Sequence, residues 1–209
     1  MSKKHQDKMN ENYKFTRHVY DITRPLFLFG RNSLLEDLNP RLGETICEIG
    51  CGTARNLVRL SQRTQNVQLI GLDASTLMLE KASSKLKKNN LEKKIKLYHG
   101  MAENYIFEEQ IDKFIFPYSL SMIPKPKEAL TNIFNQLPPG GSIYILDFGS
   151  FKYWPSIVKE PFFGFLNFFQ VYPDHEVLNI FEFNKECKSK VKSKLGGYSY
   201  FATLTRGNF

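Results

Sequence analysis

A glycine-rich turn between a short apolar segment and a helical pattern is the feature that most constrains this chain. Residues 46–56 read Ile-Cys-Glu-Ile-Gly-Cys-Gly-Thr-Ala-Arg-Asn. Gly50 and Gly52 allow the backbone to take positive φ and to approach a ligand closely, and the following helix begins with free N–H groups that can receive a polar ligand. A dinucleotide-binding turn would need a third glycine at position 55, where this chain has Arg55. The turn therefore indicates a nucleotide-like ligand other than a dinucleotide.

Short apolar runs alternate with helical patterns on both sides of this turn. We expect strands at 45–49, 67–72, 94–98, 113–118, 142–148 and 198–205, and helices at 55–62, 75–88, 103–110 and 126–137. An aromatic-rich helical segment at 13–38, with breaks at Pro25 and Gly30, precedes them. Strands that alternate with helices indicate an α/β fold with a parallel sheet and helices on both faces.

Composition limits the class of protein more than its function. With 209 residues, the chain is long enough for one well-buried core. Its net charge of +8 favours anionic partners. Three cysteines, Cys47, Cys51 and Cys187, lack metal-ligand spacing, so we expect reduced thiols and no metal. The polar N-terminus and the lack of a long apolar run predict a cytoplasmic protein without a signal peptide or membrane span.

Candidate ligand-binding residues follow successive strands, where a crevice forms at the carboxyl ends of an open α/β sheet. Glu48 can face a positively charged ligand group, and Asp73, 21 residues after Gly52, can accept hydrogen bonds from both ribose hydroxyls. Asp73 could instead be a helix N-cap, and Met78 could be a core residue rather than a contact for adenine. The later strands are followed by 100–103 and 118–122.

These motifs resemble those of class I S-adenosylmethionine (SAM) dependent methyltransferases. The resemblance rests on 48–53, 71–75, 102–104 and 137–142 and covers roughly 44–148. It implies a Rossmann-like, mostly parallel seven-stranded sheet with an antiparallel C-terminal strand, and SAM as the cofactor. The implied cofactor-binding residues are Glu48, Gly50, Cys51, Gly52, Asp73, Ala74, Met78, Met101, Ala102 and Tyr118. Many relatives carry aspartate where this chain has Met101, so we expect adenine to be held by backbone groups near Ala102, by apolar packing or by Glu103.

A narrower resemblance covers both ends of the chain. Residues 17–24, 27–31, 118–124, 147–149 and 197–198 are similar to segments of methyltransferases of betaine-lipid synthesis. This resemblance implies N-methylation of the amine of a diacylglyceryl-homoserine headgroup. We then expect residues 1–38 to form a helical lid with Tyr13, Tyr20 and Arg31 at the substrate, and residues 39–209 to form the methyltransferase domain.

The acceptor stays open between a lipid headgroup and a quinone or other small apolar metabolite. The uncharged aromatic run at 161–169 could line an acyl pocket, dip into a membrane interface or pack on the sheet. The lysines of 185–194 could meet an anionic membrane or form a solvated loop. A nucleic-acid acceptor is disfavoured, because residues 118–121 read Tyr-Ser-Leu-Ser rather than an Asn/Asp-Pro-Pro-Tyr motif. A non-catalytic SAM-binding module is the remaining alternative.

Catalysis itself points to two residues. Methyl transfer needs mainly the alignment of a nucleophile with the methyl carbon. Tyr118 and Ser119, at the end of the fourth expected strand, are placed to position the acceptor. The sequence identifies no general base.

Overall fold

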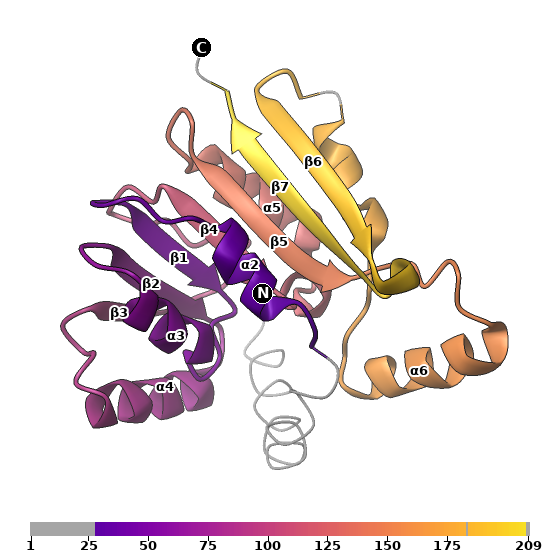
Figure 1. Cartoon of the computed structure of the whole chain (residues 1–209), viewed down its shortest axis with the longest axis horizontal. Helices are drawn as coiled ribbons and strands as arrows, with labels where there is room; N and C mark the ends of the chain where they lie inside the picture. Colours follow the sequence, from indigo (N-terminus) through magenta and orange to yellow (C-terminus); the bar gives the residue numbers. More distant parts are fainter. Residues whose placement is uncertain (1–27, 183, 208–209) are drawn as a thin grey trace.

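Seven strands form one mixed sheet in the computed structural model, which describes residues 28–182 and 184–207. The order is β3-β2-β1-β4-β5-β7-β6 (Figure 1). The strands are β1 (Thr45–Ile49), β2 (Gln68–Asp73), β3 (Ile95–His99), β4 (Lys113–Pro117), β5 (Ser142–Phe148), β6 (Cys187–Lys194) and β7 (Ser199–Arg206). Strands β1 to β5 pair in parallel, and β7 runs antiparallel to both β5 and β6. The predicted Rossmann-like α/β fold is confirmed.

Helices cover both faces of this sheet. They are α2 (Arg31–Asp37), α3 (Arg55–Arg63), α4 (Thr76–Lys88), α5 (Pro126–Asn135) and α6 (Ser156–Phe168), with 3₁₀ turns η1 (Leu120–Met122), η2 (His175–Phe181) and η3 (Leu195–Gly197). Successive strand residues point to opposite faces. In β4, Ile115 packs in the core cluster beneath α3 and α4, whereas Phe114 and Phe116 pack in the cluster beneath α5 and η2.

An aromatic cluster joins the carboxyl end of β5 to both ends of the described chain. Phe148 packs against Tyr118 and Tyr198, with ring centroids 4.8 and 5.8 Å apart. Phe151 and Leu34 belong to the same buried cluster. The start of α2, the loop after β4 and the base of α6 are therefore held together at this edge of the sheet.

The reversal of strand order lies between β1 and β4. From β1 the chain goes outward to β2 and β3, and it returns to β4 on the other side of β1. The connections after β1 and β4 consequently leave the sheet in opposite directions, which opens a crevice at their carboxyl ends.

Two predictions of local structure are wrong. The segment 103–110 is a loop, because side chains of α5 occupy its backbone groups: Asn132 Nδ2 donates to the carbonyls of Ala102 and Tyr105, both at 2.9 Å. The lysine-rich segment at 185–194 is mostly strand β6 rather than a solvated loop, because its backbone pairs with β7 along its whole length.

Two further expectations are altered at their ends. The strand expected to end at Tyr118 ends at Pro117, because Tyr118 has a φ of 61°. Of the helical segment expected at 13–38, the described part forms a helix only at Arg31–Asp37, after Gly30 with a φ of 86°. Most of the expected lid lies outside the described residues.

Candidate functional site

The glycine turn after β1 packs directly on the end of β4. Gly50 has a φ of 69°, and a Cβ placed on it would lie 2.6 Å from the Cβ of Ser119. The Gly50 N–H donates to the Leu72 carbonyl at 2.8 Å, which ties the turn to β2. Positive φ and close approach both require glycine here. The sequence pattern identified this turn correctly.

Asp73 links the glycine turn to α4. Its Oδ2 accepts from the Gly52 N–H at 2.7 Å, and its Oδ1 accepts from the Ser75 N–H at 2.9 Å. The N-cap of α4 is Ser75, whose side chain accepts from the Met78 N–H. Asp73 is therefore not the helix cap. A carboxylate offers about four acceptor positions, which suits Asp73 to binding several donors at once.

Glu48 is paired with a residue that the sequence did not single out. The carboxyl group is 2 % exposed, and its Oε1 accepts from Asn56 Nδ2 at 2.7 Å. Asn56 lies in the first turn of α3, eight residues after the acid, so the helix returns it to the strand end. This hydrogen bond orients a buried carboxylate toward the turn.

A narrow pocket opens between the ends of β1, β2 and β4. Its volume is about 80 Å³, and three flexible methionine side chains, Met78, Met101 and Met122, line it. The pocket is also lined by Gly50, Gly52, Asp73, Ala74, Ala102, Glu103, Tyr118 and Ser119. Methionine side chains rearrange readily, so this pocket can widen around a flat ring. The Ser119 hydroxyl is buried without a hydrogen-bond partner among the described residues and is available to a ligand.

The loop after β3 was expected to hold adenine through backbone groups near Ala102, through apolar packing or through Glu103. The Ala102 carbonyl is occupied by Asn132 Nδ2, so it is a structural acceptor. Ala102 itself is buried, and Met101 is half-buried in the pocket wall. Apolar packing is thus the main contribution that this loop offers.

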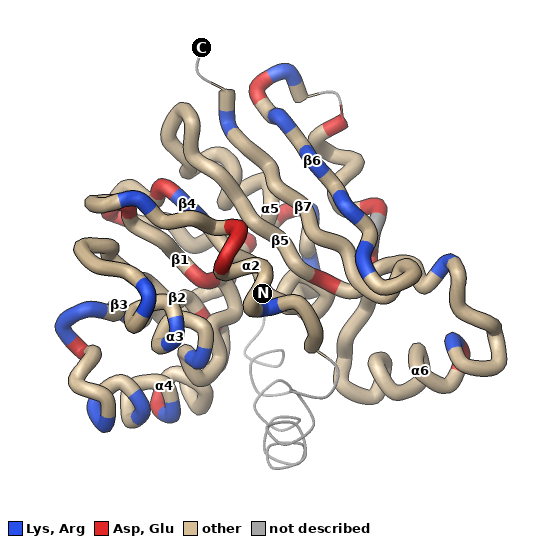
Figure 2. The backbone as a smooth tube through the Cα atoms, in the orientation of Figure 1, with Lys and Arg blue, Asp and Glu red and all other residues tan. Residues whose placement is uncertain are grey.

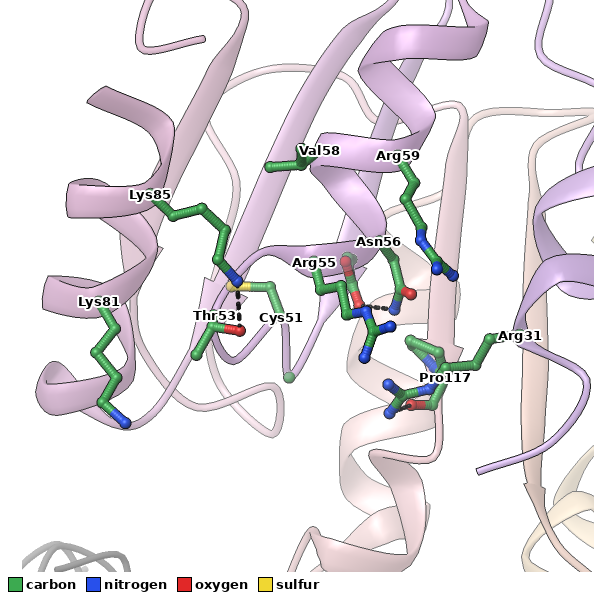
Figure 3. A pocket seen from close by; sticks show the side chains of 12 residues that line it. Arg31, Cys51, Thr53, Arg55, Asn56, Val58, Arg59, Lys81, Lys85 and Pro117 are labelled. Carbon is green, nitrogen blue, oxygen red and sulfur yellow. Dashed lines mark hydrogen bonds between the residues drawn. The ribbon is translucent and has the colours of Figure 1, made fainter. Parts of the chain in front are cut away.

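A second, larger cavity of about 640 Å³ lies on the other side of Gly50 (Figure 3). Two arginines one turn apart on α3, Arg55 and Arg59, and two lysines one turn apart on α4, Lys81 and Lys85, extend into it together with Arg31. Lys85 Nζ donates to Thr53 Oγ1 at 3.0 Å, and Arg59 Nη1 donates to Asn32 Oδ1 at 3.0 Å. Glu48 is the single carboxylate in its lining. The i, i+4 spacing of the basic residues was the sequence signal that could have found this cavity.

Tyr118 connects the end of β4 to the segment before α2. Its φ of 61° is unusual for a bulky residue and marks local strain. Its hydroxyl donates to the Phe29 carbonyl at 2.6 Å, and the Arg31 guanidinium lies 5.9 Å from its ring centroid. Burial raises the pKa of Tyr118 well above its usual value, so the phenol stays neutral. Arg31 Nη2 also lies 3.4 Å from the Pro117 carbonyl.

Asp147, near the end of β5, is a buried acid that is hydrogen-bonded to the loop after β4. Its carboxylate accepts from the N–H groups of Ser121, at 2.9 Å, and Phe148, at 2.8 Å. Burial raises the pKa of Asp147 to about 6 despite these bonds. In the sequence, Asp147 stood out only as the first residue of the segment 147–149.

The structure brings most of the predicted residues together around Gly50. Tyr13 and Tyr20 lie outside the described residues. Cys51 is buried, and burial raises the pKa of its thiol, so it packs as an apolar group. Among residues 28–182 and 184–207, no group of three or more His, Cys, Asp and Glu side chains is arranged to hold a metal ion. None of the helices in this part is long and apolar enough to cross a membrane.

Comparison with known proteins agrees with this geometry. A family model described as a methyltransferase domain matches residues 46–141, just under half of the chain. Residues 46–141 are thus similar to a methyltransferase domain and lie within the Rossmann-like fold described above. A structure of a SAM-dependent methyltransferase from Aquifex aeolicus superposes with a TM-score of 0.67, at 17 % identity, covering 96 % of this chain and 98 % of that one. Phosphoethanolamine N-methyltransferase 2 of Haemonchus contortus, in complex with SAM, gives a TM-score of 0.69 at 15 % identity, over 85 % of this chain and 52 % of that one.

Two relatives of similar sequence are demethylmenaquinone methyltransferases, not betaine-lipid methyltransferases. The demethylmenaquinone methyltransferase of Lactobacillus johnsonii is 28 % identical over 142 residues, which are 64 % of this chain and 58 % of the relative. That of Oceanobacillus iheyensis is 29 % identical over 144 residues, 68 % of this chain and 56 % of the relative. The methyltransferase domain thus spans under two thirds of these relatives. The narrower resemblance to betaine-lipid methyltransferases is not confirmed.

Proposed function

We propose that this chain transfers the methyl group of SAM to a small apolar acceptor of the quinone class. The observation that carries the choice of acceptor is the similarity to demethylmenaquinone methyltransferases. It favours the quinone alternative over N-methylation of a lipid headgroup, since the phosphoethanolamine N-methyltransferase structures are 15–16 % identical to this chain and share the fold alone.

The described residues fit SAM at both of its ends. Asp73, in the wall of the narrow pocket, can bind the ribose hydroxyls, while Met78, Met101 and Ala102 enclose adenine. Glu48 can face the ammonium group, and the arginines of the larger cavity can bind the carboxylate, so the two cavities that share Gly50 match a zwitterionic amino-acid group beside an apolar ring. Gly50, Cys51, Gly52 and Ala74 form the backbone surface between them.

The chain contributes position rather than covalent chemistry. SAM supplies a methyl group already activated on a sulfonium. Tyr118 and Ser119 lie where the acceptor must approach, and the Ser119 hydroxyl can hydrogen-bond an oxygen on the acceptor ring. Holding the reacting atoms in line contributes up to about 7–11 kcal/mol in well-oriented systems. We include residues 1–38 in the proposal as a lid, with Tyr13, Tyr20 and Arg31 facing the acceptor.

The aromatic cluster suits a flat apolar acceptor. Phe148, Tyr198 and Met122 surround Tyr118. Asp147, the buried acid behind them, already accepts two backbone hydrogen bonds. An amine headgroup would require a carboxylate or a desolvated pocket to hold it, whereas an apolar ring can pack on the Tyr118 and Met122 side chains that line the narrow pocket. Nucleic acid is not among the proposed acceptors.

The test offers the protein different methyl acceptors, with SAM as the methyl donor in every reaction. Purified protein is incubated with methyl-labelled SAM and, in separate reactions, a short-chain demethylmenaquinone in its quinol form, diacylglyceryl-homoserine, and RNA. Label in the quinol product supports the proposal, because the electron-rich ring carbon of the quinol is the nucleophile. Label only in the lipid would restore the headgroup reading, and tight SAM binding with no labelled product would favour a non-catalytic module.

A further inference from the structure

Helix α6 carries apolar side chains on both of its faces. On the inner face, Phe162 lies 5.4 Å from Phe151 between ring centroids, and Leu166 is fully buried. On the outer face, Ile157 is 85 % exposed and Phe168 is 68 % exposed. The charged residues of this helix, Lys159 and Glu160, lie in its first half, and the rest of it is almost entirely apolar. The inner face packs on the aromatic cluster. The outer face is largely exposed, and Phe168 touches only the rim of that cluster through Phe169, with ring centroids 5.2 Å apart.

The apolar surface continues on both sides of the helix. Six of the eleven large exposed hydrophobic residues in the described part of the chain fall within 153–172. We call them the α6 surface: Tyr153, Ile157, Val158, Phe165, Phe168 and Tyr172. In Figure 1, α6 projects away from the sheet at the lower right. Large exposed apolar patches are typical of interaction sites.

Basic residues border the α6 surface. Strand β6 has lysine at four alternate positions, Lys188, Lys190, Lys192 and Lys194, which therefore share one face of the sheet. Figure 2 shows this basic line running along β6 toward its end, next to η3. There, the N–H of Phe151 donates to the Gly197 carbonyl at 2.8 Å. Lys152 follows directly in the sequence, so a basic residue also lies in the loop that leads into α6.

From this arrangement, we propose that the α6 surface docks the protein on an anionic lipid bilayer. The 13 residues of α6 are too few to span a bilayer, but an apolar helix with aromatic side chains can lie in the interface. Each lysine near an anionic surface contributes about fivefold in affinity. The apolar face would supply insertion and the lysines would supply attraction.

Charge distinguishes a bilayer from a second copy of this chain. A symmetric dimer through the α6 surface would bring the two copies of Lys152 toward each other, in a chain whose net charge is already +8. An anionic bilayer instead complements that charge. The lysines on edge strand β6 also discourage pairing with a strand of another molecule.

The α6 surface is joined to the proposed acceptor site. The Tyr172 N–H, just after α6, donates to the Ser121 carbonyl in the loop after β4 at 2.8 Å. Phe169 and Met122 pack against the same cluster as Tyr118. A membrane-dissolved apolar acceptor would thus leave the bilayer next to the site. This last step rests on the proposed function, whereas docking itself does not.

The first test is sedimentation of the SAM-free protein with vesicles. We expect binding to phosphatidylcholine vesicles that contain one third phosphatidylglycerol to exceed binding to pure phosphatidylcholine. Ile157→Ser combined with Phe168→Ser should weaken binding by at least about tenfold, since two large apolar groups no longer insert. The matched control is Leu42→Ser with Ile106→Ser, which are 77 % and 67 % exposed elsewhere on the molecule and should bind as the wild type does.

The second test separates attraction from insertion. Lys192→Gln with Lys194→Gln should lower affinity for the anionic vesicles by about twentyfold, while Lys87→Gln with Lys88→Gln on α4 should change it little. Trp154 is the single tryptophan of the chain and lies at the base of α6. Brominated lipids should therefore quench its fluorescence.

Three results would overturn the proposal: no vesicle binding, equal binding by the Ile157/Phe168 variant, or concentration-dependent dimerisation that this variant abolishes. The dimer result would assign the α6 surface to a second copy. Vesicle binding without methyl transfer to any acceptor would overturn the proposed function alone. Transfer to a water-soluble short-chain quinol without vesicle binding would overturn docking alone.

Discussion

Gly50 and Ser119 come so close that a single added methyl group cannot fit between them: a Cβ on Gly50 would lie 2.6 Å from the Ser119 Cβ. This contact sets the distance between the turn after β1 and the loop after β4. The turn after β1 lines both cavities proposed to hold the methyl donor, and the loop after β4 lines the smaller one. The distance between these two elements therefore depends on the absence of a side chain at Gly50.

Gly50→Ala should impair both SAM binding and folding. The new Cβ must push Ser119 outward, and alanine is also strained at a φ of 69°. We expect SAM affinity by calorimetry to fall at least about tenfold, with about 1–3 kcal/mol lost in the free energy of unfolding. Gly43→Ala is the control, because Gly43 has a φ of 84° with nothing within 4 Å of a built Cβ. Equal losses of SAM affinity in the two variants would show that backbone strain at positive φ, and not the contact with Ser119, causes the loss.

Asp73→Asn tests the ribose-binding role. The amide keeps one acceptor oxygen for the Gly52 or Ser75 N–H but loses the negative charge and half of the lone pairs. We expect SAM affinity to drop by about tenfold or more, since charge-assisted hydrogen bonds contribute roughly 1.5–3 kcal/mol. Asp112→Asn provides the comparison, because Asp112 Oδ2 similarly accepts a backbone N–H, that of Thr45 at 2.8 Å, at the opposite end of β1. The Asp112 variant should lose stability and keep its SAM affinity; the reverse outcome would remove Asp73 from the site.

Arg55→Gln tests whether the larger cavity receives the donor's carboxylate. We expect weaker SAM binding by about three- to tenfold and a shallower dependence of the affinity on salt, because one screened charge interaction is removed. Arg63→Gln, in the last turn of the same helix, is the control. An unchanged salt dependence in the Arg55 variant would argue that the carboxylate binds elsewhere.

The sequence predicted the fold well where local pattern and packing agree. The turn at Gly50, the acid at Asp73 and five parallel strands followed from short-range patterns that the sheet reinforces. The helix expected at 103–110 failed because Asn132 and Gln136, about thirty residues away, take over the hydrogen bonds of that loop. Strand β6 was missed because its lysines indicate solvent, and only pairing with β7 makes it a strand. Asn56 and Asp147 became visible as site residues through tertiary contacts alone.

Asp147→Asn should flatten the dependence of stability on pH. Burial raises the pKa of Asp147 to about 6 in the folded protein, whereas an unfolded chain has a value of about 3.9. The folded state therefore holds this proton more tightly than the unfolded state, so the contribution of Asp147 to stability is fully present below about pH 4 and is lost as the pH rises through about 6. The loss amounts to about 3 kcal/mol for a shift of about two units.

Urea unfolding of wild type and variant between pH 4.5 and 7.5 measures this loss. The Asn side chain cannot ionise, so the variant should lose less stability across this range than the wild type does. Its absolute stability is expected to be lower at acid pH, because the amide NH₂ faces one of the two N–H groups that the carboxylate accepted from Ser121 and Phe148. Asp37→Asn, at the exposed end of α2, is the matched control for removing one carboxylate. Parallel pH profiles for wild type and Asp147→Asn would show that Asp147 holds no extra proton in the folded protein.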